Sequence, residues 1–186
     1  TCTATSTDGK GGSGSAAAST TITNHAPVVG TVSLSPATVY TNDTLTASAS
    51  TSDADGDSLT VTFDWYVGGA LVQSGATATL DGATSFDKDD VVYAVVSADD
   101  GIDTTSSTSA SVTIANTAPT APTVAIDPSA PEAGDSLLCQ VDTDSVDDDG
   151  DTVTYTMAWT VDGVAYSAGG TTDTGGLDSG DPGWVG

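Results

Sequence analysis

The sequence predicts an all-β protein made of antiparallel β-sandwiches, and three observations support this prediction. The 186 residues include 33 Thr and 22 Ser but one Glu and only two Lys or Arg, a composition that favours strands and turns over helices. Hydrophobic and polar residues alternate over residues 59–67 and again over 153–161, as in strands with one buried face. Asp-Gly pairs typical of tight turns separate these segments.

The chain repeats itself at an offset of 92 to 94 residues. The Asn-x-Ala-Pro motif at residues 24–27 recurs at 116–119, and the Asp-x-Asp-Gly-Asp motif at 53–57 recurs at 147–151. Trp65 and Trp159 occupy the same place in their alternating segments. The whole chain therefore spans about two repeat lengths.

The repeat is out of phase with the chain. Three pairs align without gaps at offset 92: Asp8 with Asp100, Ile22 with Ile114 and Asn24 with Asn116. Residues 1–25 are therefore predicted to form the last hairpin of a sandwich, and residues 26–116 a complete sandwich. Residues 117–186 are predicted to form a sandwich without its last two strands, in which residues 180–186 lead into the strand that residue 1 continues.

Two interpretations of this phase remain open. The chain is either a portion of a long tandem array, or a subunit whose hairpin completes the sandwich of a neighbouring copy, head to tail. An isolated two-stranded hairpin is marginally stable in water, and a sandwich with an uncovered face and open edges demands a partner. Both interpretations place residues 1–25 against residues 117–186 of another copy.

These motifs in this order resemble bacterial tandem immunoglobulin-like (Ig-like) repeats. Such repeats are related to the cadherin-like and polycystic-kidney-disease (PKD) repeats of long surface and secreted proteins. The resemblance covers essentially the whole chain and implies tandem Ig-like sandwiches with Trp65 and Trp159 in their cores. The chain departs from antibody-type domains because Val92 and Gly186 stand where a tyrosine corner has its Tyr.

The resemblance also implies an inter-sheet disulfide between Cys2 and Cys139. The complete repeat has Ala47 and Ala94 at the two equivalent positions, so Cys is present at both positions or at neither. Because Cys2 and Cys139 belong to different copies of the fold, the bond is expected between chains or with the next segment of a longer chain. Two unrelated buried thiols are the alternative. A disulfide implies an extracellular or cell-surface location.

Carboxylates gather where each repeat begins. Clustered carboxylates repel one another unless a cation lies among them, and alternate Asp residues around a Gly suit the flexible oxygen coordination of Ca²⁺. Calcium at both junctions is therefore predicted, and solvated acidic turns are the alternative. The expected ligands are Asn24, Asp53, Asp55, Asp57, Asp99 and Asp100 at the first junction, and Asp8, Asn116, Asp147, Asp149 and Asp151 at the second. By resemblance to cadherin-like arrays, these ions would stiffen the junctions.

Charge and composition argue against several functions. A net charge of −24 opposes binding to nucleic-acid phosphates, and no apolar run approaches the roughly 20 residues of a membrane-spanning helix. The single His, His25, lies in a Pro-containing linker without a recognisable catalytic partner, so no enzymatic activity is expected. Residues 42–44 match the N-glycosylation pattern, with Asn42 as acceptor.

The sequence therefore predicts a structural subunit or repeat of a calcium-stiffened extracellular filament or surface stalk. Copies would join head to tail by strand complementation. The alternative is an adhesin or carbohydrate-binding Ig-like module of a secreted or surface protein.

Overall fold

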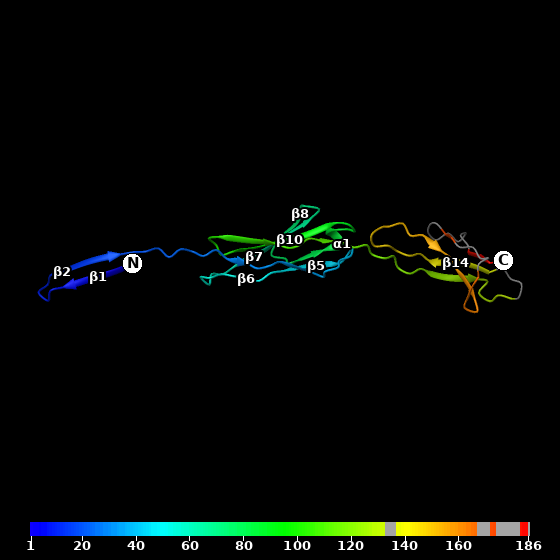
Figure 1. Ribbon diagram of the computed structural model, residues 1–186, viewed down its shortest axis with the longest axis horizontal. Coiled ribbons are helices and arrows are strands. Elements are labelled where there is room, and N and C mark those ends of the chain that lie inside the picture. The colour runs from blue at the N-terminus through cyan, green and yellow to red at the C-terminus, as the bar shows by residue number, and fades with distance from the viewer. Residues whose placement is uncertain (133–136, 167–171, 174–182, 186) are drawn as a thin grey trace.

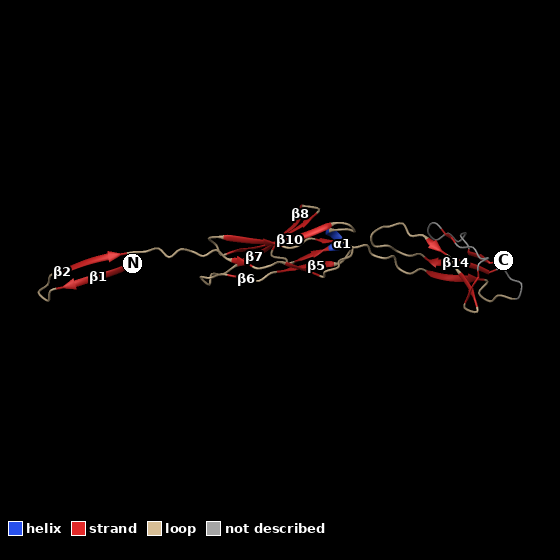
Figure 2. Cartoon of the chain, in the orientation of Figure 1, coloured by secondary structure: helices blue, strands red, loops and turns tan. Residues whose placement is uncertain are grey.

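The regular structure of the described chain is almost all β, in antiparallel sheets, as predicted. The computed structural model describes residues 1–132, 137–166, 172–173 and 183–185. Three parts follow one another along the molecule: an N-terminal hairpin, a central sandwich-like unit and a second β-rich unit (Figures 1 and 2). In the described part of the chain, no helix has the length and apolar character needed to cross a bilayer.

The N-terminal hairpin pairs β1 (Cys2–Thr7) with β2 (Ser13–Ala18). Cys2 lies opposite Ala18 and Ala4 opposite Ala16, and because cross-strand partners share a face, these four small side chains lie on one side. The backbone N–H of Asp8 closes the turn on the carbonyl of Gly12 (3.0 Å). Every residue from 1 to 23 is exposed, so neither face of the hairpin packs on the rest of the described chain.

Two antiparallel sheets form the central unit. One has the order β11-β10-β7-β8, with β12 also paired to β10, and the other has the order β4-β5-β9. A short pair, β3 with β6, and a single helical turn, α1, complete it. The bounds are β3 (Val28–Val29), β4 (Ser33–Ser35), β5 (Thr44–Ser48), β6 (Thr51–Ser52), β7 (Thr60–Val67), β8 (Ala70–Gly75), β9 (Thr79–Asp81), α1 (Gly82–Ser85), β10 (Val91–Asp99), β11 (Thr104–Thr108) and β12 (Val112–Thr113).

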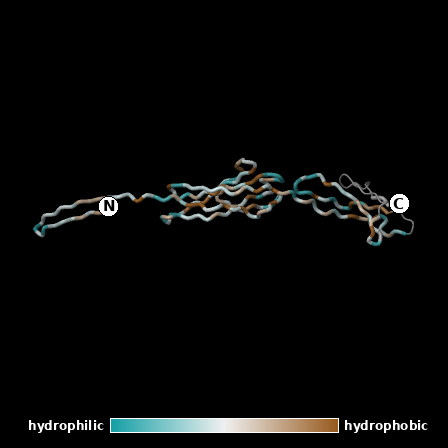
Figure 3. Tube along the Cα trace, in the orientation of Figure 1, coloured by the Kyte–Doolittle hydropathy of each residue, from teal (hydrophilic) through white to brown (hydrophobic). Residues whose placement is uncertain are grey.

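The core lies between these two sheets. Trp65 of β7 and Val96 of β10 pack in one cluster with Leu45 of β5 and Leu80 of β9. Every second residue of β10 is buried, which is the alternation expected of a strand with one inner face. Each large apolar side chain buried in this way contributes about 1.5–3 kcal/mol. Hydrophobic residues follow these strands, whereas the connecting loops are hydrophilic (Figure 3).

The second unit has a smaller core and three separate sheets. Val141, Tyr155 and Met157 are buried, with Cys139 and Val153 packed against them. The sheets are β13-β14-β19, β15-β18 and β16-β17. The bounds are β13 (Thr123–Asp127), β14 (Leu137–Thr143), β15 (Tyr155–Thr156), β16 (Trp159–Val161), β17 (Val164–Tyr166), β18 (Thr172–Asp173) and β19 (Gly183–Val185).

The last described strand, β19, pairs with a different strand from the one that the sequence predicted. In the central unit the strand before the last hairpin, β10, pairs with β7, and residues 183–185 were expected to begin its equivalent. Instead β19 pairs antiparallel with β14, at the edge that β9 occupies beside β5 in the central unit. An open strand edge offers unpaired N–H and C=O groups to any segment within reach. Residues 180–182 and 186 of the same prediction lie outside the described residues.

Candidate cation sites at the junctions

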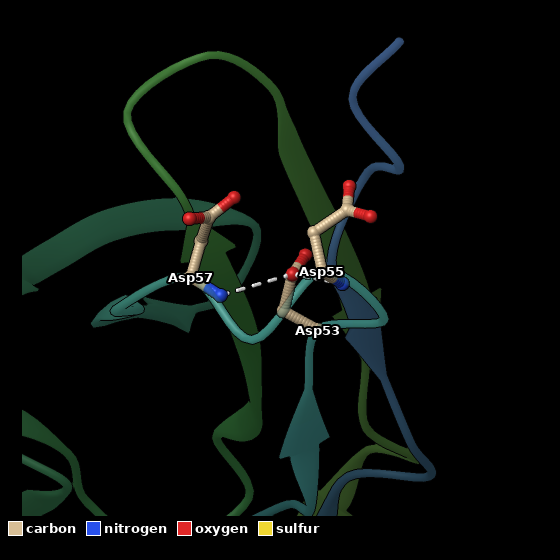
Figure 4. A group of neighbouring side chains, drawn as sticks. All are labelled: Asp53, Asp55 and Asp57. Atoms are coloured by element: carbon tan, nitrogen blue, oxygen red, sulfur yellow. Dashed lines mark hydrogen bonds between the residues drawn. The ribbon is translucent and has the colours of Figure 1, made fainter. Parts of the chain in front are cut away.

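The first acidic loop connects β6 to β7 and is shaped by one carboxylate. Oδ1 of Asp53 accepts the backbone N–H groups of Asp55 (2.8 Å) and Asp57 (3.2 Å), and Gly56 takes the left-handed conformation at the bend (φ 82°). The three side chains each offer one oxygen within 4.8 Å of the others (Figure 4). Oδ2 of Asp53 is buried and accepts no hydrogen bond from the described chain.

The incoming linker lies against this loop. The backbone N–H of His25 donates to Oδ2 of Asp55 (2.7 Å), and the ring Nδ1 of His25 lies 3.0 Å from Oδ1. The backbone N–H of His25, followed by its ring, holds the pKa of Asp55 below its ordinary value. The charge of Asp100, in the β10–β11 turn, acts in the opposite direction on the pKa of Asp55.

The amide of Asn24 joins the linker to the same turn. Its Nδ2 donates to Oδ2 of Asp100 and to Oδ2 of Asp103, each at 3.0 Å. The Asn24 amide and the backbone N–H groups of Asp103 and Ile102 lower the pKa of Asp100. The linker, the acidic loop and the hairpin turn therefore meet at one end of the central unit.

Not every predicted ligand of the first junction faces this cluster. Asp53, Asp55 and Asp57 come together, and Asn24 and Asp100 adjoin them. The carboxylate of Asp99 instead accepts the backbone N–H of Gly101 (2.8 Å) and the hydroxyl of Thr104, within its own hairpin. Asp103, which the sequence analysis did not single out, shares the Asn24 amide. Its position three residues after Asp100 in a turn was the available signal.

The second acidic loop repeats the geometry of the first. Oδ1 of Asp147 accepts the N–H groups of Asp149 (3.0 Å) and Asp151 (3.2 Å), and Gly150 has φ 74°. The backbone N–H of Thr117 donates to Oδ2 of Asp149 (2.5 Å), as His25 does to Asp55. These three carboxylates also offer oxygens within 4.8 Å of one another.

The far end of the central unit contacts this second loop. The ammonium of Lys88, which lies between α1 and β10, pairs with Asp151, and this carboxylate raises the pKa of Lys88. The hydroxyl of Thr41, between β4 and β5, is the first cause of the lowered pKa of Asp149. The second triad therefore lies where the central unit meets the second unit.

Two predicted residues of the second junction, Asp8 and Asn116, make no hydrogen bond to the second triad among the described residues. Asp8 is in the β1–β2 turn, where its carboxylate accepts the N–H groups of Lys10 (2.8 Å) and Gly12 (2.9 Å), and these donors lower its pKa. The amide of Asn116 donates to the carbonyl of Thr117 (2.8 Å).

Both cysteines are free thiols in the single chain. Cys2 is exposed, whereas Cys139 is half-buried with its Sγ 3.8 Å from Sδ of Met157. Their strands, β1 and β14, lie at opposite ends of the molecule (Figure 1). Asn42, the residue of the glycosylation pattern, is exposed with φ 72°.

Comparison with known proteins finds no matching family model, no matching curated protein and no matching solved structure.

Proposed function

We propose that the chain is a structural subunit or repeat of an extended extracellular or cell-surface filament, built from tandem Ig-like sandwiches. In this proposal the β1–β2 hairpin of one copy completes the second sandwich of the next. One observation carries it: Ile22 is 91% exposed, whereas its repeat equivalent Ile114 is 1% exposed in the central core. Ile22 therefore occupies a core position of the repeat, but no described residue packs around it.

The donor face of the hairpin follows the same comparison. Cys2 and Ala4 are exposed on β1, and their equivalents on β10, Ala94 and Val96, are buried against the opposite sheet. Leaving such a face in water forfeits the free energy of its burial. The hairpin is thus a segment with an inner face that no described residue covers.

The acceptor is the second unit, whose apolar surface is incompletely covered. Val124 is 59% exposed, whereas its equivalent Val32 is 4% exposed. Trp159 is half-buried, whereas Trp65 is completely buried. In the central unit Ala94 lies opposite Trp65 and Val96 opposite Phe63. The same register would place Cys2 opposite Trp159 and Ala4 opposite Met157, a small residue against a large one each time.

This complementation gives an open chain of copies. The donor lies at one end of the molecule and the acceptor at the other (Figure 1), and a head-to-tail contact of this kind continues without closing on itself. The packing is the same whether successive copies are separate subunits or consecutive segments of one longer polypeptide.

We further propose that Ca²⁺ binds the acidic triads and stiffens the junctions. Oδ2 of Asp53 is a buried oxygen without a hydrogen-bond donor among the described residues, and a hard cation satisfies such an oxygen. Both triads lie beside a linker between units. A cation there would hold each linker against its loop.

The thiols provide the test of complementation. When the full chain is oxidised, we expect Cys2 of one copy to bond to Cys139 of another, because the proposed register places β1 across the acceptor core from β14, as β10 and β5 lie in opposite sheets of the central unit. Non-reducing electrophoresis should then show a ladder that reductant collapses. Such a bond typically adds about 2–4 kcal/mol to stability.

The controls separate a specific bond from random oxidation. Cys2→Ser and Cys139→Ser should each remove the ladder, and mixing the two variants should give a single dimer band. In a polypeptide of two joined copies, Cys139 of the first should bond to Cys2 of the second. Free thiols in the joined form, or dimers linked by Cys2–Cys2 bonds in place of the ladder, would contradict the proposed function.

A further inference from the structure

We propose that Lys10, at the tip of the β1–β2 hairpin, pairs with the acidic loop 147–151 of the neighbouring copy, whose second sandwich the hairpin completes. This pairing would select the second sandwich as the acceptor. The inference rests on the complementation proposed above and identifies the charged contact that orients it. The chain has only two Lys or Arg residues, and on this view both serve the same loop.

The central unit shows where a hairpin tip lies. The β10–β11 turn lies near the 53–57 loop, because neighbouring residues of the linker bind Asp100 and Asp55. Asn24 binds Asp100 while the next residue, His25, binds Asp55. The tip, the linker and the acidic loop therefore form one contact region at that end of the sandwich.

Repeat equivalence transfers this arrangement to the second unit. At offset 92, Asp8 takes the place of Asp100, and Lys10 takes the place of Ile102. A hairpin inserted in the same way would bring the tip of β1–β2 beside the 147–151 loop. Within the part of the chain that the structure describes, the Lys10 ammonium makes no ion pair.

The second acidic loop is more negatively charged than the first, as a contact with Lys10 requires. The second loop has four carboxylates, because Asp148 stands where the first loop has Ala54. The second loop already binds one ammonium, that of Lys88 on Asp151, so a lysine side chain is a ligand that it accepts. The tip that faces the first loop carries Ile102 and Asp103 and supplies no positive charge. Charge complementarity therefore assigns the Lys10 hairpin to the second loop.

The linker offers a second contact for the same tip. Asn24 donates its amide to Asp100, whereas the amide of Asn116 turns to the carbonyl of Thr117. Asp8 of an inserted hairpin would stand where Asp100 does and would offer the Asn116 amide a carboxylate acceptor. Within one turn, Lys10 would contact the acidic loop and Asp8 would contact the linker.

The experiment measures association of the full chain by sedimentation velocity, together with hydrogen exchange of the β1 amides. Lys10→Glu should weaken association roughly tenfold at low salt, because a like charge then faces four carboxylates, and the loss should shrink as salt screens the pair. Asp148→Lys alone should also weaken association. Asp148 is exposed and outside the triad, so this variant leaves the loop hydrogen bonds in place.

The double variant Lys10→Glu/Asp148→Lys should recover most of the association, and Lys10→Gln should show an intermediate loss. If the wild-type chain associates and protects its β1 amides but Lys10→Glu behaves the same at every salt concentration, the Lys10 inference fails and complementation stands. If the β1 amides exchange freely in both the separate and the joined copies, complementation fails and the Lys10 inference with it.

Discussion

At the scale of single residues, one aspartate determines the shape of each acidic loop. Asp53 and Asp147 each accept two backbone N–H groups from residues that follow them. The donors and the carboxylate therefore belong to the same loop. Such turns form between near neighbours in sequence and need no distant partner. Asp55 and Asp149, in contrast, are held by the linker that precedes each unit.

The lowered pKa values give the chain an acid-sensitive stability. Asp55, Asp100 and Asp149 all have pKa values below the ordinary 3.8, so the unfolded chain binds protons more readily than the folded one. Their contribution is therefore present above about pH 4 and is lost as the pH falls through the lower folded-state values. Urea unfolding between pH 3 and 6 should show the decrease. Asp55→Asn should reduce the pH dependence of the central unit, and an unchanged slope would contradict the role of the His25 contact.

At the scale of elements, the same kind of hairpin occurs in two environments. The β10–β11 hairpin lies in a core between two sheets, whereas the β1–β2 hairpin forms with both faces in solvent. The two hairpins differ in sequence on this face: Cys2 stands where β10 has Ala94, and Ala4 stands where β10 has Val96. Local pairing is therefore similar in the two hairpins, and only the surroundings differ.

A matched pair of substitutions separates these environments. Ile114→Ala should lower the unfolding free energy of the central unit by about 2–5 kcal/mol, because it opens a cavity in a packed core. Ile22→Ala should leave the urea midpoint of the separate chain unchanged but should weaken head-to-tail association, measured by sedimentation velocity. An equal loss of stability in both separate-chain variants would mean that Ile22 is already packed within its own chain.

At the scale of the whole molecule, which has a net charge of −24, the two acidic triads lie where a linker enters each unit. The two triads differ in their neighbours: the first has His25, and the second has Lys88 paired to Asp151. An ammonium beside a triad lowers the local negative potential that attracts a divalent cation. Because Lys88 pairs with a carboxylate of the triad itself, whereas the additional Asp148 lies outside the triad, we expect the first triad to be the stronger of the two proposed calcium sites.

Calcium should raise the melting temperature of the chain, and EDTA should reverse the effect. In a calorimetric titration the tighter site should disappear in Asp55→Asn and the weaker site in Asp149→Asn, because each variant removes a charged ligand. Asp148→Asn is the control, since this exposed residue lies in the second loop but outside the triad. A melting temperature that neither calcium nor EDTA alters would rule out the cation sites.

Several features were determined by the sequence alone, because they depend on neighbours along the chain. Alternation over residues 59–67 predicted β7, and the alignment of residues 1–25 with the end of a repeat predicted the β1–β2 hairpin. The two Asp-x-Asp-Gly-Asp motifs predicted two loops of like shape, since their hydrogen bonds join residues two and four apart. Turn chemistry and strand periodicity are local, so a single sequence carries them.

Other features were decided only by the tertiary structure. Lys88 meets Asp151 across 63 residues of sequence, because the far end of the central unit contacts the second acidic loop. The choice of Asp103 over Asp99 beside Asn24 follows from how the hairpin turn folds over the linker. The pairing of β19 with β14 follows from an edge left open in the second unit. Contacts of this kind depend on which surfaces remain unfilled after each unit has folded, and no local pattern in the sequence records that.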